Sequence, residues 1–280
     1  MTLLQYLLPQ HILSRLGAKV ATCRIRLIKN LVIYLYCKFY RISMTEALET
    51  NPFNYSTFND FFTRALQPAA RPIAIGEQTI MAPVDGKVWQ IGKINVNCFV
   101  NAKSHSFTVE QLLAAKDLAK QFHDADFVVV YLAPSDYHRI HMPIKGKLVS
   151  MHYVPGKLFS VKPSIINNIP GVFARNERVV ITFETAVGTM VMVLVGALFV
   201  GSIVTTWAGT IVPSCQKIVT SWDYTKQDIV FAKGEEIGRF KFGSTVILLY
   251  PAGAIQWQQE LQQNTMIKMG QSLGCGKNAK

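Results

Sequence analysis

Residues 238–251 read GRFKFGSTVILLYP and combine a strand signal with an apparent defect. The run from Val246 to Tyr250 consists of β-branched, aliphatic and aromatic residues that favour a strand. Gly243-Ser244 stands just before it, and a glycine in a strand adds backbone entropy and offers no side chain to pack. The pair is therefore either a kink at the start of a strand or part of a reactive site.

The sequence on both sides of this run predicts a mostly β domain. From residue 185 to residue 216 there is no charge, but glycines interrupt a run rich in Val, Ile and Thr, which favours two or three buried strands over a membrane span. One helix is expected at 109–122, where Thr108 and Gln111 form a capping-box pattern. Further strands are expected at 87–96, 126–133, 147–155, 178–186, 229–232 and 244–250.

The first part of the chain, residues 1–70, has a helical pattern. Ser43 or Thr45 is the expected cap of EALE (46–49), and Ser56 is the expected cap of TFNDFFTRAL. The sequence QPAARP (67–72) then ends this pattern. We therefore expect an α+β protein with an N-terminal helical region at 1–70 and a β-rich domain at 71–280.

The net charge of +12 is concentrated near the N-terminus, where no acidic residue precedes Glu46. Basic residues alternate there with large apolar ones, as in helices that lie in a membrane interface. A nucleic-acid partner would require motifs that are absent. The alternative is an ordinary amphipathic helix packed on the rest of the protein. There is no convincing signal peptide. Because the uncharged run is expected to form strands and not a membrane span, we expect a peripheral membrane protein.

The cysteines give no sign of a metal site. The chain has five cysteines, scattered and without a CxxC pair. This pattern indicates a reducing compartment and argues against zinc, and we expect no metal.

The stretch YLAPSDYHRIHMP (131–143) is the densest group of reactive side chains. On a strand His138 and His141 would face opposite sides, whereas on a helical turn they would share a face. Because Pro134-Ser135-Asp136 can open a single turn, we expect both imidazoles to enter one site. The alternative is a surface turn with solvated histidines.

Asp85 and two serines complete the set of candidates. Asp85-Gly86 has the form of a hairpin turn between strands, which is the common reading of such a pair. Ser202 and Ser244 each follow a glycine, and a serine activated by histidine and aspartate is a nucleophile. No GxSxG, GxxxxGK[ST], GxGxxG or HExxH motif is present, so residue types alone leave the choice of serine open.

Several long motifs resemble those of one family. They are APVDGKV, APSDYHRIHMP, YVPGKLFSV, FARNERV, VGSIVTTWAGT and KGEEIGRFKFGSTVI. In order and spacing they resemble the phosphatidylserine decarboxylase proenzymes of the bacterial and mitochondrial type. The resemblance runs from about Phe58 to about Tyr250, while the N-terminal helices resemble the family only in character. Phe242 replaces the leucine of the usual Leu-Gly-Ser-Thr motif.

The resemblance implies that the chain cuts itself between Gly243 and Ser244. Asp85 would orient His141, which would activate Ser244 to attack the carbonyl of Gly243. The resulting ester would break by β-elimination, giving chains of residues 1–243 and 244–280. The second chain would begin with a pyruvoyl group made from Ser244, and this group would be the cofactor.

The resemblance further implies a lyase that converts phosphatidylserine to phosphatidylethanolamine through a Schiff base on the pyruvoyl group. His138 would handle the carboxylate or the proton that replaces it. Tyr153, Phe159 and Ser160 lie in a segment that resembles the substrate pocket. We also expect a homodimer of cleaved protomers. It would dock on an anionic membrane surface, on the cytoplasmic face of the cell membrane.

Two other functions remain open on the residues alone. One is a membrane-associated serine hydrolase that uses Asp85, His141 and Ser244 without self-cleavage. The other is a non-enzymatic β-rich protein that binds lipid.

Overall fold

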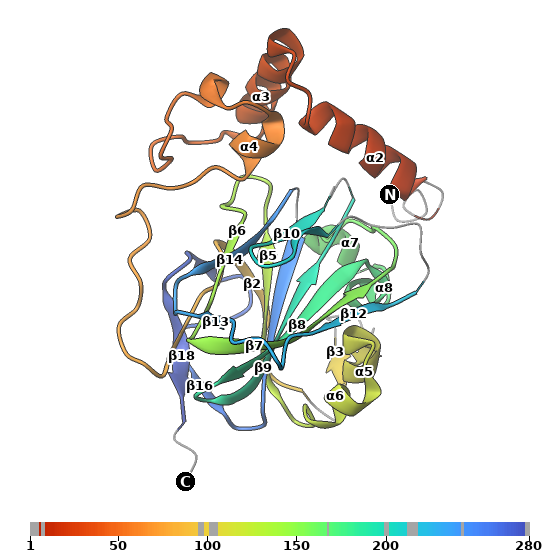
Figure 1. The fold of residues 1–280 in the computed structure, drawn as a ribbon, viewed down its shortest axis with the longest axis vertical. Helices are drawn as coiled ribbons and strands as arrows, with labels where there is room; N and C mark the ends of the chain where they lie inside the picture. Colours follow the sequence, from red (N-terminus) through yellow and green to blue (C-terminus); the bar gives the residue numbers. More distant parts are fainter. Residues whose placement is uncertain are drawn as a thin grey trace.

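The computed structural model describes residues 6, 9–94, 98–100, 106–166, 168–198, 202–211, 218–241 and 244–277. Helices near the N-terminus form one end of the molecule, and strands form most of the remainder (Figure 1). The α+β fold class predicted from the sequence is confirmed. The helix α4 ends at Phe62 and the first strand begins at Thr79, while the domain boundary at 67–72 stays a prediction.

A nine-stranded antiparallel sheet is the centre of the β domain. Its order is β12-β7-β8-β9-β15-β5-β2-β17, with β13 paired to β7. The strand β15 contains the run that the sequence singled out, and it pairs with β5 on one side and β9 on the other. The bounds are β2 Gly86–Lys93, β5 Asp126–Leu132, β7 Gly146–Val154, β8 Arg178–Thr185, β9 Gly188–Val195, β12 Thr220–Asp223, β13 Val230–Phe231, β15 Ser244–Tyr250 and β17 Met266–Ile267.

The uncharged run forms strands, as predicted. It contributes β9 to the large sheet, and then β10 (Ile203–Thr205) and β11 (Gly209–Ile211) to a smaller one. No helix in the described ranges is both long and apolar enough to span a bilayer.

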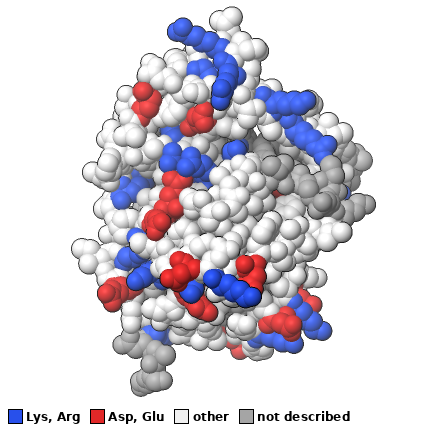
Figure 2. Space-filling view, in the orientation of Figure 1, with Lys and Arg blue, Asp and Glu red and all other residues white. Residues whose placement is uncertain are grey.

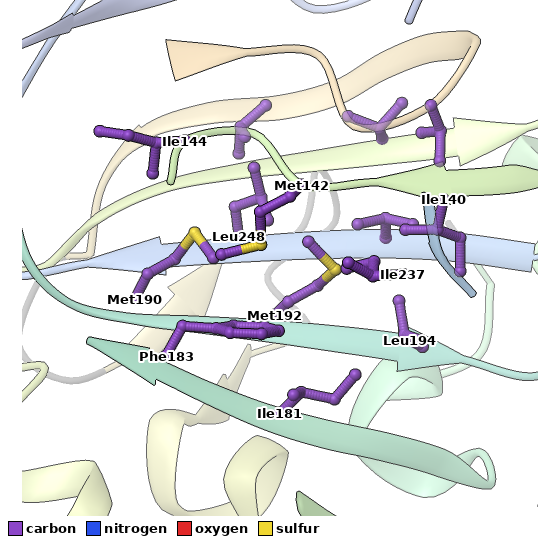
Figure 3. Packing of buried hydrophobic residues seen from close by; sticks show 14 of the residues in the cluster. Ile140, Met142, Ile144, Ile181, Phe183, Met190, Met192, Leu194, Ile237 and Leu248 are labelled. Carbon is purple, nitrogen blue, oxygen red and sulfur yellow. The ribbon is translucent and has the colours of Figure 1, made fainter. Parts of the chain in front are cut away.

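Two smaller sheets cover one face of the large sheet. One has the order β11-β10-β14-β6, with β6 at Arg139–His141 and β14 at Glu236–Phe240. The other has the order β1-β18-β16, at Thr79–Met81, Ser272–Gly276 and Ile255–Trp257. In Figure 3, Ile140 and Ile237 of the smaller sheet point toward Met192, Leu194 and Leu248 of the large one. Because successive side chains of a strand point to opposite faces of its sheet, every second apolar side chain enters this core.

Short helices and the β3–β4 hairpin (Cys98–Val100, Ser106–Thr108) cover the opposite face. The helix predicted at 109–122 has its capping box of Thr108 and Gln111, but it is split into α5 (Val109–Leu113) and α6 (Lys116–Lys120). Ala114 between them is left-handed, with φ of 51°, which ends the first helix. The helices α7 (Pro163–Ile166) and α8 (Val172–Arg175) complete this layer.

We call the N-terminal helices the helical cap: α2 (Gln10–Ala21), α3 (Arg26–Tyr40), the 3₁₀ turn η1 (Pro52–Asn54) and α4 (Phe58–Phe62). Phe58, Phe61 and Phe62 of α4 pack with Ile33 and Tyr36 of α3, because they recur at helical spacing.

Two local predictions in the helical cap were wrong. The hydroxyl of Thr57, rather than Ser56, accepts the capping hydrogen bond from the Asp60 amide. Residues 46–49 form a turn instead of a helix, in which Ala47 bridges to Leu66. A tertiary backbone pairing therefore prevails there over the weak local helix signal.

Candidate active site

Ser244 is the first residue of β15 and lies opposite Leu132 of β5. Its side chain is fully buried, and its hydroxyl has no hydrogen-bond partner among the described residues. The buried hydroxyl of Thr245 likewise has no hydrogen-bond partner among the described residues. Phe242 and Gly243 lie outside the described residues. Buried hydroxyls without partners are rare because each costs about 1–3 kcal/mol. Those of Thr182 and Tyr250, elsewhere in the sheet, are also without a partner in the described chain, so it is the position of Ser244 beside the predicted cleavage site that makes its hydroxyl a candidate nucleophile.

His138 lies directly before β6 and is completely buried. Its ring stacks on Phe62, with centroids 4.1 Å apart. Nε2 donates a hydrogen bond to the Ala133 carbonyl at 3.1 Å, and Nδ1 has no partner in the described part of the chain. Burial lowers the pKa of His138 to about 3, so the ring is neutral at pH 7 and presents a free lone pair on Nδ1.

His141 is the last residue of β6. Its Nδ1 donates to the carbonyl of Gly234 at 2.9 Å, and its Nε2 accepts a hydrogen bond from the Tyr137 hydroxyl at 3.0 Å. Burial is the main reason that its pKa is lowered. The predicted helical turn is wrong: β6 is extended, so His138 packs on the helical cap while His141 packs on Tyr137. The alternative of solvated surface histidines is also wrong, since both rings are buried.

Asp85 lies in a bend before β2, and the hairpin reading of Asp85-Gly86 is wrong because β1 and β2 pair with other strands. The Asp85 carboxylate accepts hydrogen bonds from the guanidinium of Arg71, with Nε to Oδ1 at 2.9 Å, and from the amide of Met269 at 2.8 Å. Gly86 is required because a Cβ there would lie 2.5 Å from the Tyr131 carbonyl oxygen. Asp85 is thus a buried ion-pair partner.

Backbone hydrogen bonds join the segments that contain Asp85, the two histidines and the predicted cleavage site. The amide of His141 donates to Pro83, and the amide of Phe240, just before the predicted cleavage site, donates to His138. Within the described residues, however, Asp85, His141 and Ser244 are not hydrogen-bonded to one another; each has the surroundings given above. Ser202, the rival serine, is also buried, and its carbonyl accepts from the Lys241 amide.

Hydrogen bonds from and to side chains fix the turn before His138. The Asp136 carboxylate accepts from the Ala133 amide at 2.7 Å, and the Tyr36 hydroxyl of α3 donates to the Pro134 carbonyl at 2.7 Å. Burial raises the pKa of Asp136 to about 6. The helical cap is therefore coupled directly to the loop that carries His138.

The segment with the predicted substrate-pocket residues lies at the same end of the sheet. The Phe159 ring is buried against Tyr6, at 5.2 Å between centroids, and its amide donates to Asn176. The Ser160 hydroxyl accepts a long hydrogen bond, 3.3 Å, from the Lys162 amide. Tyr153 is buried and donates to the Glu177 carboxylate at 2.9 Å.

Glu177 is a residue that the sequence reasoning missed. It is 4% exposed, and burial raises its pKa to about 7. Its carbonyl accepts from the Gly196 amide, and Val195 pairs with Thr245, so Glu177 lies two strands from Ser244 at the same end of the sheet. The only sequence signal was a charged residue just before the strand predicted at 178–186, and burial of a carboxyl group is not visible in such a pattern.

Comparison with known proteins gives one consistent result. A family model described as phosphatidylserine decarboxylase matches residues 58–275, and a model described as PSD matches residues 1–41. The chain is 46% identical to a phosphatidylserine decarboxylase proenzyme of Saccharophagus degradans over 271 residues, covering 96% of this chain and 95% of the relative. It is 49% identical to a proenzyme of the same name from Shewanella woodyi, with the same coverage. The chain belongs to the phosphatidylserine decarboxylase family of enzymes.

Proposed function

We propose that this protein converts phosphatidylserine to phosphatidylethanolamine after cutting its own backbone between Gly243 and Ser244. The structural observation that carries the proposal is the buried Ser244 hydroxyl, which has no partner in the described chain and stands at the start of the central strand. A nucleophile kept free of competing hydrogen bonds is available for attack on the adjacent backbone carbonyl. The relatives are named proenzymes, which supports a maturation step.

In the cleavage step the Ser244 hydroxyl transfers its proton to His141 and its oxygen bonds to the carbonyl carbon of Gly243. The Gly243–Ser244 C–N bond breaks, which leaves an ester and a free amine. Loss of the Ser244 α-proton then breaks the Cβ–O bond and frees residues 1–243. Water replaces the nitrogen as ammonia leaves, and residue 244 becomes a pyruvoyl group.

Asp85 acts in this step through its charge. Arg71 and the Met269 amide hold the carboxylate in place, and its negative charge favours the protonated form of His141. The neutral His141 of this structure, with its pKa lowered by burial, is in the form that accepts a proton.

The residues around position 244 fit a pyruvoyl group. The β15 strand is hydrogen-bonded on both sides, so the new chain end stays fixed after cleavage. When formed, the group supplies a carbonyl that binds the substrate amine and accepts the electrons released with carbon dioxide. His138, with Nε2 fixed on Ala133 and Nδ1 without a partner in the described chain, is the candidate for handling the substrate carboxylate or the proton that replaces it.

A diacyl lipid substrate requires contact with a bilayer, and the helical cap supports such contact. In α2 the apolar side chains Ile12, Leu16 and Val20 are exposed at helical spacing, while Gln10 and Ser14 are buried. In α3 Leu27, Leu31, Leu35 and Phe39 are exposed, while Lys29 is buried with its ammonium on two carbonyls. Both helices thus turn apolar faces outward, as interfacial helices do.

Lysine and arginine side chains lie over the same end of the molecule, at the top and upper right of Figure 2. Their charge would favour anionic lipid. We therefore propose a peripheral enzyme on the cytoplasmic face of the cell membrane. A homodimer of cleaved protomers stays a prediction.

Denaturing electrophoresis with intact mass measurement of active protein tests the proposal. We expect a fragment of residues 244–280 whose N-terminus is blocked by a pyruvoyl group. An intact chain that hydrolyses lipid esters would instead indicate the serine hydrolase. An intact chain that binds vesicles without any turnover would indicate the lipid-binding protein.

A further inference from the structure

A cavity of about 210 Å³ lies beneath the helical cap, apart from the hydroxyl of Ser244. It is bordered by the end of α4, the loop before it, β6 and β14. Three arginines line it, namely Arg64, Arg139 and Arg239, together with the acids Glu49 and Asp60 and the ring of Tyr55. The mechanism proposed above assigns no role to any of these side chains.

Arg64 is the unusual member of this group. It is 6% exposed, yet it forms no ion pair within the described residues, and its Nε has no hydrogen-bond partner there. Its contacts are a long hydrogen bond from Nη2 to the Ser135 carbonyl, 3.4 Å, and the face of the Phe61 ring at 5.7 Å. Removing a cation from water costs several kcal/mol unless an anion or several acceptors compensate.

Arg178 is a buried arginine of the same protein whose guanidinium has a full set of acceptors. It is equally buried, but its guanidinium donates to the carbonyls of Leu112, Gln111, Ala174 and Asn176 at 2.6–3.0 Å. Arg64 has no comparable set of acceptors. The difference leaves the Arg64 guanidinium available to bind an anion from outside the chain.

The other two arginines of the cavity share one carboxylate. Arg139 and Arg239 both bind the Glu236 carboxylate, at 2.8 and 2.7 Å, so one negative charge serves two cations. The acids at the rim are engaged by their own loop: Asp60 accepts from the Thr57 hydroxyl, and Glu49 accepts from Asn51 and Asn54. Three guanidinium groups around one cavity suit an oxyanion with several acceptor atoms.

We propose that Arg64, Arg139 and Arg239 form a binding site for a phosphate group. The cavity is large enough for a phosphate and a few further atoms, and it adjoins the helical cap, whose apolar residues face outward. The phosphate belongs either to a small dissolved molecule or to the headgroup of a membrane lipid. Neither source depends on the decarboxylation chemistry.

Thermal unfolding of the full-length protein in sodium phosphate tests the site, with sodium chloride of equal ionic strength as the reference. We expect phosphate to raise Tm in a saturable way, by about 5 °C at saturation. Arg239→Gln, at a partly exposed position, should remove this rise, and so should Arg64→Met if that variant folds. Arg175→Gln, which removes the same charge beside Tyr6 and Phe159, should retain it.

Flotation with vesicles of phosphatidylcholine and phosphatidylglycerol distinguishes the two sources. If Arg239→Gln loses both the phosphate effect and, relative to Arg175→Gln, vesicle binding, the ligand is a lipid headgroup. If it loses only the phosphate effect, the ligand is a dissolved phosphate compound. The proposal is wrong if phosphate stabilises the wild type no more than chloride does, or if Arg239→Gln keeps the full effect.

Discussion

The helical cap and the end of the large sheet around Ser244 depart from ordinary folding rules in opposite ways. The helical cap exposes large apolar side chains, with Leu27 84% and Phe39 78% exposed, and buries the ammonium of Lys29. The sheet end buries polar atoms of Ser244, Thr245 and His138 without partners in the described chain. Each arrangement costs free energy in water alone.

We infer that the two costs serve two different requirements. Exposed apolar surface is stabilised when a bilayer covers it, whereas a buried hydroxyl or imidazole without a partner is available for reaction. Substitutions at the sheet end should therefore change chemistry, and substitutions on the helical cap should change membrane binding.

The largest effect is expected from Ser244→Ala. The variant has no hydroxyl to attack Gly243 and cannot give a pyruvoyl group, so we expect an uncleaved, inactive chain on denaturing gels. Ser202→Ala, at the other buried serine, is the matched control and should cleave normally. Normal cleavage of Ser244→Ala would show that another residue is the nucleophile.

His138→Ala should separate cleavage from decarboxylation. Because His138 contacts Phe62 and Ala133 rather than His141, we expect the chain to mature. Decarboxylation should then fall by roughly 10²–10⁴-fold, the usual loss on removing an acid–base group. Intact mass and carbon dioxide release from the same sample measure both steps. Failure to mature would place His138 in self-cleavage instead.

Glu177→Gln should make the protein more stable above neutral pH. Burial raises the pKa of Glu177 to about 7 from 4.5. Between these values the folded state holds a proton that the unfolded state has lost, so wild-type stability falls as pH rises. The variant should lack this fall and gain up to about 3 kcal/mol at pH 8.

Urea unfolding at pH 5 and pH 8 measures this gain. Glu184→Gln, at an exposed residue of the strand β8 that follows Glu177, is the control and should follow the wild type. Equal pH dependence in all three proteins would show that Glu177 ionises normally.

The smallest effect is expected on the helical cap. Leu27→Asn with Phe39→Asn should weaken vesicle binding by roughly tenfold or more, because two exposed apolar side chains no longer enter the bilayer. Unfolding free energy should change by less than about 0.5 kcal/mol for each substitution. Ile75→Asn, at a residue 95% exposed outside the helical cap, should bind vesicles normally. A large loss of stability would show that these side chains pack on the protein.

Much of the fold could be predicted because its signals are local. Alternation and β-branched runs identified β5, β7, β8, β9 and β15, and the glycines of the uncharged run correctly indicated strands instead of a membrane span. The errors were also local. A left-handed Ala114 split one helix, and backbone pairing of Ala47 with Leu66 replaced another.

Most of the strands, the position of Gly243-Ser244 before one of them, and the motifs that resemble the family could be read from local sequence. The tertiary structure decided which partners each polar group has. Asp85 bonds to Met269, 184 positions along the chain, and Tyr153 bonds to Glu177. The structure also decided that Ser244 is buried without a partner and that Arg64 is a buried cation without an ion pair in the described chain. Strand propensity depends on neighbouring residues, whereas burial and pairing depend on distant segments that meet only when the sheets pack.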